Sequence, residues 1–215
     1  MECAPAFPAS PTERPCSASL WQLLATCTRG LRANLSSSSS CCWPGPFSFA
    51  GVNLSPENVI FSSELSFAML SPHPVLPGHA IVTPRRHVKA LFDLSDDERE
   101  DLFLVTQATS YALNGVTGTD GCTLLVQQGE AAEQHVSQLY VHLVPRRKDD
   151  LPSNDEIYPL LESSPVLPDP DGREAATDGV CGGPLKERVA GFAVREWMLQ
   201  LAADKTAPPC ADSHQ

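Results

Sequence analysis

Apolar and polar residues alternate most regularly in the segment 138–146, which reads Gln-Leu-Tyr-Val-His-Leu-Val-Pro-Arg. Side chains along a β-strand point to its two faces in turn, so the leucines and valines at 139, 141 and 143 share one apolar face. The opposite face carries Gln138, Tyr140 and His142, three side chains that form hydrogen bonds. Pro145 has no N–H to give to a sheet, so the strand is expected to end there.

The segment before this strand predicts a partner for it. An apolar run at 122–126 is followed by 127–132, which combines polar side chains with a glycine turn. We therefore expect a hairpin-like pair of strands joined by a short polar loop. This loop is expected to hold a small ligand.

Further strands are expected at 47–49, 59–61, 65–70 and 79–83, the last of them ended by Pro84. The clearest helix is predicted over 95–113. Ser95 and Glu98 have the spacing of a capping box, and Asn114-Gly115 is expected to end the helix. Its core-facing stripe recurs at helical spacing and consists of Leu102, Val105, Thr109 and Ala112.

The two ends of the chain differ in composition from the part between them. Residues 1–46 are rich in proline and serine, which predicts a disordered extension, with an organelle-targeting peptide as the alternative. The segment 149–184 is acidic and rich in proline and glycine, so most of it is expected to be a mobile loop. A helix is predicted at 185–203. The main domain is therefore expected to cover 47–204, followed by a tail at 205–215.

Charge and composition narrow the class of protein. The 215 residues carry a formal net charge of −11, which argues against nucleic acid or an anionic membrane as the main partner. No apolar run approaches the roughly 18 residues of a membrane span. The eight cysteines form no Cys-x-x-Cys pair, so neither a zinc site nor a disulfide framework is predicted. An intracellular, cytoplasmic protein is expected, or one directed to mitochondria or another organelle by residues 1–46.

Several blocks of the sequence resemble the histidine triad (HIT) family of nucleotide hydrolases, and most of all its fragile histidine triad branch, which splits diadenosine triphosphate. They are 63–68, 75–79, 93–103 and 127–146. The resemblance spans about 47–154 and a helix near the C-terminus. It implies an α+β fold with an antiparallel sheet of about five strands, one long helix and a C-terminal helix. It also implies a homodimer formed by extension of the sheet.

The resemblance assigns roles to particular residues. The family's strand alternates three histidines with apolar residues. Here Gln138 takes the first position, Tyr140 takes the middle one and only His142 remains. Gln127 matches a glutamine that contacts phosphate oxygens, and His79 matches a histidine near the triad whose expected role is a supporting hydrogen bond.

The positions that meet the nucleoside match less well. Phe49 and Leu70 are apolar where the family packs the base and ribose, although ordinary core residues would look the same. Ser71 replaces an asparagine that meets the ribose, which puts ribose recognition in doubt. His135 is an odd number of residues before Tyr140, so it is expected to face away from the site or to lie in the loop.

The expected chemistry follows from Tyr140. In the family, the middle histidine attacks the α-phosphate and becomes a nucleotidyl-histidine, which water then hydrolyses. A phenol with a pKa of about 10 is almost wholly protonated at neutral pH and is a poor nucleophile. Catalysis is therefore expected to be weak or lost, while an adenine nucleotide or dinucleoside polyphosphate, with or without a divalent cation, is still bound.

Three functions remain open on this basis. The first is a nucleotide-binding protein with little or no hydrolase activity. The second is an active dinucleoside polyphosphate hydrolase with a rebuilt site, and the third is an interaction protein that has lost the ligand. Nucleotide binding separates the first two from the third, and turnover separates the second from the first.

Overall fold

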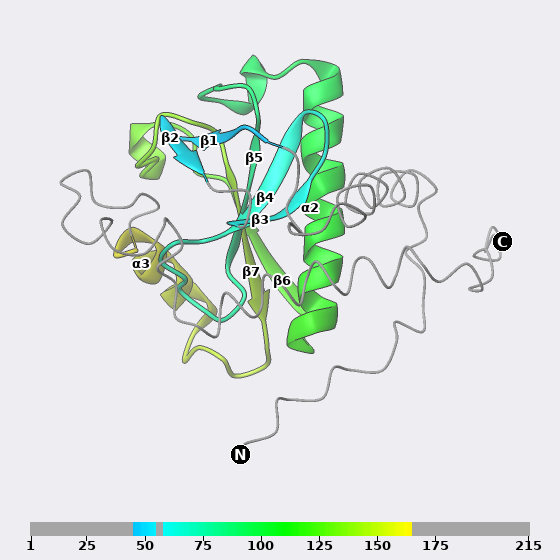
Figure 1. Ribbon diagram of the computed structural model, residues 1–215. Helices are drawn as coiled ribbons and strands as arrows, with labels where there is room; N and C mark the ends of the chain where they lie inside the picture. The colour runs from blue at the N-terminus through cyan, green and yellow to red at the C-terminus, as the bar shows by residue number, and fades with distance from the viewer. Residues whose placement is uncertain (1–44, 55–57, 165–215) are drawn as a thin grey trace, which may run out of the picture.

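The computed structural model describes residues 45–54 and 58–164 (Figure 1). Its centre is a five-stranded antiparallel sheet with the strand order β3-β4-β5-β7-β6. The strands are β3 (Val59–Ser62), β4 (Ser66–Leu70), β5 (Ala80–Pro84), β6 (Gly121–Leu125) and β7 (Val141–Arg146). The α+β class and the antiparallel five-stranded sheet expected from the sequence are confirmed. The predicted helix at 185–203 lies outside the described residues.

The helix α2 (Asp96–Thr117) covers one face of this sheet (Figure 1). Its predicted start is confirmed, because Ser95 Oγ accepts a hydrogen bond from the Glu98 N–H and the Glu98 carboxylate accepts one from the Ser95 N–H. The predicted apolar stripe is buried. The predicted end is wrong: the helix continues to Thr117, and Gly118 follows it in the left-handed conformation that ends many helices.

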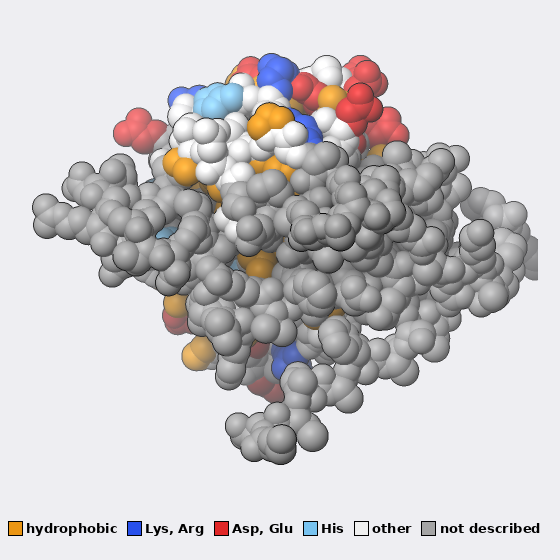
Figure 2. Space-filling model, viewed as in Figure 1, with side chains coloured by type: hydrophobic (Ala, Val, Ile, Leu, Met, Phe, Trp, Pro, Cys, Tyr) orange, Lys and Arg blue, Asp and Glu red, His pale blue; other side chains and the backbone are white. Residues whose placement is uncertain are grey.

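Charge is distributed along α2 as the helix dipole favours. Asp96 and Asp97 lie in the first turn, where the partial charge of the helix is positive. Figure 2 shows acidic side chains gathered over this end of the helix. None of the described helices is long and apolar enough to cross a membrane.

The other face of the sheet is covered by two smaller units (Figure 1). One is a two-stranded sheet of β1 (Phe47–Phe49) and β2 (Val52–Leu54). The other is the helix α3 (Ile157–Glu162), preceded by the 3-10 helix η4 (Asn154–Glu156). Both helices lie in the segment that was predicted to be a loop, and α3 forms because Ile157 and Leu161 pack against Val144 of β7. The remainder of that segment, 165–184, lies outside the described residues, as do 1–44.

Of the two prolines that were expected to end strands, Pro84 does so and Pro145 does not. Pro84 is the last residue of β5 and is paired with Ser66. Pro145 lies inside β7 and is paired with Cys122 of β6. The missing N–H is tolerated because β5 pairs with β7 only as far as Leu143, which leaves Pro145 with a neighbour on one side.

The connection between β6 and β7 is longer than the predicted short loop. It runs from 126 to 140 and contains the 3-10 helix η3 (Glu130–Ala132). A further 3-10 helix, η2 (Leu91–Asp93), precedes α2. Because β7 begins at Val141, Gln138 and Tyr140 precede the strand in which they were predicted to lie. The antiparallel pairing of β6 with β7 is as predicted.

Candidate functional site

His79 and His142 meet between two central strands. His79 immediately precedes β5, and His142 lies in β7 opposite Ile81. A hydrogen bond of 2.9 Å joins His79 Nε2 to His142 Nδ1. The two residues are 1% and 2% exposed. Burial lowers the pKa of His79 to about 3 and that of His142 to about 4, so both imidazoles are neutral at pH 7.

The loop between β4 and β5 determines where His79 lies. Gly78 has a φ of +84°, which glycine adopts without strain. A Cβ atom at this position would lie 3.1 Å from Thr117 Cγ2 and 3.2 Å from Pro145 Cγ. The glycine therefore lets the chain pass closely between α2 and β7 and enter the sheet at His79.

Backbone hydrogen bonds hold His79 on both sides. The His79 N–H donates to the Leu76 carbonyl at 3.1 Å, and the His79 carbonyl accepts from the Ser71 N–H at 2.9 Å. On the ring, Nδ1 accepts from the Val75 N–H at 3.3 Å. The supporting hydrogen-bond role predicted for His79 corresponds to these contacts and the contact with His142.

Tyr140 lies beside His142, with ring centroids 4.9 Å apart. Phe49 of β1 also packs edge-on against Tyr140, with ring centroids 5.6 Å apart, so the small sheet covers the tyrosine. Tyr140 is 1% exposed, and burial raises the pKa of its hydroxyl to about 12. Tyr140 Oη and His142 Nε2 are both buried, and neither has a hydrogen-bond partner in the described part of the chain.

Gln138 is part of the framework around this site. Its Oε1 accepts from the Ala50 N–H at 2.7 Å, and its Nε2 donates to Thr83 Oγ1 at 3.1 Å. Ala50 has a φ of 51° and forms the turn between β1 and β2. The side chain that was predicted to face a ligand thus ties this turn to β5, which keeps Phe49 over Tyr140.

The other predicted site residues are placed around this group. Phe49 and Leu70 belong to the hydrophobic core, as ordinary core residues would. Ser71 is buried, and its hydroxyl donates to the His73 carbonyl at 3.2 Å. Gln127 is half-buried and follows β6. The structure therefore brings Tyr140, His142, His79 and Phe49 into contact, with Leu70 and Ser71 next to His79.

The connection between β6 and β7 contributes two residues whose importance the strand pattern did not reveal. Gln134 accepts from the Gly129 N–H at 2.8 Å and donates to the Gln138 carbonyl at 3.3 Å, so it braces the turn. His135 is exposed, and after burial it is the second cause that lowers the pKa of His142. In the sequence, the only indication of their importance was that Gln134 and His135 are adjacent and follow the glycine turn at Gly129.

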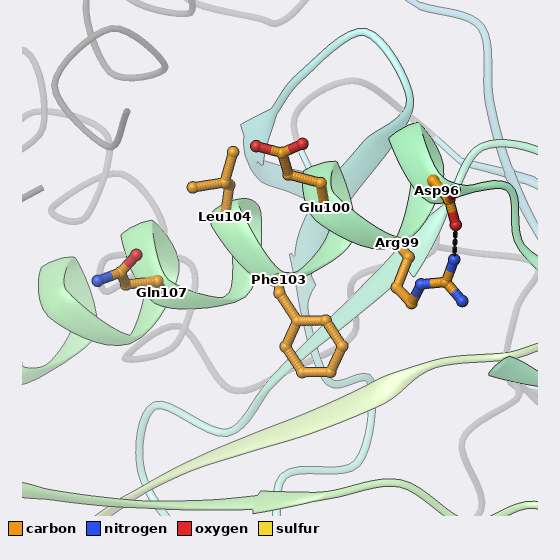
Figure 3. A pocket seen from close by; sticks show the side chains of 6 residues that line it. All are labelled: Asp96, Arg99, Glu100, Phe103, Leu104 and Gln107. Atoms are coloured by element: carbon orange, nitrogen blue, oxygen red, sulfur yellow. Dashed lines mark hydrogen bonds and ion pairs between the residues drawn. The ribbon is translucent and has the colours of Figure 1, made fainter. Parts of the chain in front are cut away.

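A second concave feature lies elsewhere on the molecule. An open hollow of about 400 Å³ follows the outward side of α2, and Figure 3 shows its lining by Asp96, Arg99, Glu100, Phe103, Leu104 and Gln107. None of the predicted site residues lines it. His142 shares its face of β7 with Val144, which packs under α3, so the buried histidines lie on the face of the sheet opposite α2. The described residues bring together no set of three His, Cys, Asp or Glu side chains that would hold a metal ion.

Known proteins resemble this chain in sequence and fold. Residues 53–149 match the HIT domain family. The bifunctional bis(5'-adenosyl)-triphosphatase/adenylylsulfatase FHIT of Arabidopsis thaliana is 34% identical over 137 residues, which cover 64% of this chain and 74% of that protein. The bis(5'-adenosyl)-triphosphatase of Dictyostelium discoideum is 40% identical over 104 residues, covering 48% of this chain and 70% of that protein. The solved diadenosine triphosphate hydrolase of Plasmodium falciparum shares the fold, with a TM-score of 0.50 and 22% identity over 65% of this chain and 94% of that chain.

The framework role of Gln138 predicts a loss of stability on substitution. Gln138→Leu has a similar volume but leaves the Ala50 N–H without its acceptor, so the free energy of unfolding should fall by roughly 1 to 3 kcal/mol. Urea denaturation measures this change. Gln107→Leu, on the exposed side of α2, is the matched control and should change the free energy by less than about 0.5 kcal/mol. Equal effects of the two substitutions would contradict the framework role.

The buried histidines predict that mild acid destabilises the protein. Their pKa values in the folded chain lie below the ordinary value of 6.5, so between about pH 6.5 and pH 4 the unfolded chain binds more protons than the folded chain. The free energy of unfolding should therefore fall by roughly 2 kcal/mol or more from pH 7 to pH 5. Urea denaturation at each pH tests this, and the dependence should shrink in His142→Gln. The same slope in that variant would show that other groups cause it.

Proposed function

The chain belongs to the HIT domain family, and we propose that it is a nucleotide-binding member of this family in which hydrolysis is weak or absent. Two of its relatives, at 34% and 40% identity, are bis(5'-adenosyl)-triphosphatases. Adenine mononucleotides and dinucleoside polyphosphates are therefore the proposed ligands.

The observation that carries the proposal is the pair of buried polar atoms, Tyr140 Oη and His142 Nε2. Neither has a partner in the described part of the chain, and the two rings are adjacent. Leaving a buried polar atom unpaired costs about 1 to 3 kcal/mol, and native structures contain few such atoms. Two of them on adjacent rings favour a ligand that supplies hydrogen-bonding oxygens here, as a phosphate does.

Weak hydrolysis follows from the state of the Tyr140 hydroxyl. In the family resemblance, position 140 belongs to the histidine that attacks the phosphate. With a pKa of about 12, only about one Tyr140 hydroxyl in 100,000 is ionised at pH 7. The adjacent His142 is a neutral imidazole, which does not offer the positive charge that would lower this pKa. The hydroxyl is thus suited to bind a phosphate rather than to attack it.

The remaining contacts of the nucleotide are proposed from the family resemblance. Gln127 would contact the phosphate oxygens, and Phe49 and Leu70 would flank the nucleoside. Ser71 would contribute less to the ribose, because its hydroxyl already donates to the His73 carbonyl. A divalent cation would enter with the phosphates of the nucleotide.

An active hydrolase with a rebuilt site is the second candidate, and His135 is the observation that favours it. This imidazole is exposed, and after burial it is the second cause that lowers the pKa of His142. It would have to reach the phosphate from the connection between β6 and β7. Measurable turnover by the unmodified chain, abolished in His135→Asn, would select this candidate.

We also propose that the protein forms a homodimer through the edge strand β6. Among the described strands it has a neighbour on one side only, and its Leu124 is 53% exposed. The opposite edge strand, β3, is buried along its whole length. An exposed strand edge is a template for pairing with a second chain.

Restoring the histidine is the direct test of the proposed function. The unmodified chain should bind AMP in calorimetry and split diadenosine triphosphate very slowly. Tyr140→His should raise turnover by about a thousandfold, which corresponds to roughly 4 kcal/mol of transition-state stabilisation. Chromatographic detection of the released AMP measures this.

Tyr140→Phe is the matched control, because it keeps the ring and removes the oxygen. It should bind AMP more weakly and gain no turnover. Fast hydrolysis by the unmodified chain that disappears in Tyr140→Phe would make the tyrosine the nucleophile. No AMP binding in the unmodified chain and no turnover in Tyr140→His would instead favour an interaction protein that has lost the ligand.

The proposed dimer has its own test. Light scattering at tens of micromolar should give twice the 23.1 kDa of one chain. Leu124→Asp places a charge at the proposed contact and should shift the protein towards the monomer. Phe92→Asp, at an exposed position in η2, is the control and should leave the mass unchanged. A monomer in the unmodified chain would remove the proposal.

A further inference from the structure

We infer that His79 is a positioning residue that fixes His142 as a hydrogen-bond donor towards the bound phosphate. The identity of the ligand rests on the proposed function. The arrangement of protons rests on the hydrogen bonds of the chain itself.

The backbone N–H of Val75 determines which atoms donate and which accept in these hydrogen bonds. An amide N–H is always a donor, and this one points to His79 Nδ1 at 3.3 Å. His79 Nδ1 must therefore present its lone pair. A neutral imidazole carries one proton, so the proton of His79 lies on Nε2.

The proton position of His79 in turn determines the proton position of His142. His79 Nε2 and His142 Nδ1 are 2.9 Å apart, and a hydrogen bond between two ring nitrogens needs one donor and one acceptor. His79 Nε2–H is the donor, so His142 Nδ1 is the acceptor. The proton of His142 consequently lies on Nε2, the buried atom that has no partner in the described residues.

The opposite arrangement places two donors against each other. If His142 Nδ1–H donated to His79 Nε2, the proton of His79 would move to Nδ1 and face the Val75 N–H. A cationic His79 or His142 would also place two N–H groups in contact. Burial disfavours that charge as well, in agreement with the lowered pKa values of both residues.

The consequence for the ligand is a pair of neutral donors on one face of the sheet. Tyr140 offers its O–H and His142 offers its Nε2–H, with their rings adjacent. Such a pair complements the oxygens of an ionised phosphate. His142 Nε2–H can only donate, so it offers no acceptor to a ligand that presents an N–H or O–H group at that atom. The phosphate of AMP should therefore be bound in its ionised form.

Nuclear magnetic resonance on the full chain tests the arrangement of protons directly. The chain has six histidines, and long-range proton–nitrogen correlations on 15N-histidine protein distinguish the two neutral tautomers of each. His142→Gln assigns the signals of His142, and His79→Gln assigns those of His79. At pH 7 both residues should carry the proton on Nε2. A proton on Nδ1 of His142 would overturn the inference.

Substitutions at His79 test its effect on binding. His79→Phe keeps a flat ring but has no hydrogen-bonding atom, so the affinity for AMP should fall about tenfold. His79→Gln offers an acceptor oxygen and a donor N–H in one neutral side chain, and it should keep the affinity within about threefold of the unmodified chain. His73→Phe, an exposed position in the same loop, is the matched control and should bind normally.

The tautomer of His142 in His79→Phe completes the test. Without the donor at His79, a fraction of His142 should carry its proton on Nδ1. Unchanged affinity together with an unchanged tautomer would overturn the role of His79. If His79→Phe does not fold, the tautomers of the unmodified chain still decide the question. A chain that shows the expected tautomers but binds no AMP would refute the proposed ligand and support the proton arrangement.

Discussion

The hydrogen bond between His79 and His142 is the contact on which the rest of the site depends. It forms where β5 and β7 pair, in a position from which water is excluded. A buried imidazole is tolerated when it is neutral and its ring nitrogens are paired. The loop between β4 and β5 meets this requirement, because Gly78 lets the chain turn into the sheet and the Val75 N–H pairs the outer nitrogen of His79.

Among the described residues, this arrangement leaves two buried polar atoms on adjacent rings without a hydrogen-bond partner, Tyr140 Oη and His142 Nε2. The protein retains them although burial without a partner costs stability, which is common where a ligand completes the hydrogen bonding. The surrounding structure keeps the two rings in place. Phe49 packs against Tyr140. Phe49 precedes the turn at Ala50, and the hydrogen bonds of Gln138 connect this turn to Thr83 of β5. A group that the family resemblance would place at the ligand has become part of the support.

The sequence predicted best those features that depend on neighbouring residues. The capping box of Ser95 and Glu98 and the stripe of α2 were predicted correctly, because their spacing lies within a few turns of one helix. The end of α2 was placed too early, since Asn114-Gly115 looks like a stop but Gly118 has the left-handed conformation. The helix α3 was missed because its apolar residues are few and lie in an acidic segment, and it is stabilised by packing on β7.

The sequence by itself determined the family, the antiparallel α+β fold and the polar residues from which a site would be built. Those features follow from the local alternation of apolar and polar residues and from sequence blocks that occur in a fixed order. Only the tertiary structure decided which of these residues meet and in which direction their protons lie. His79 and His142 are 63 residues apart in the chain, and Gln138 lies 88 residues from Ala50. Hydrogen-bond direction and burial are properties of such distant pairs, so no local pattern specifies whether a histidine or a glutamine serves the ligand or the framework.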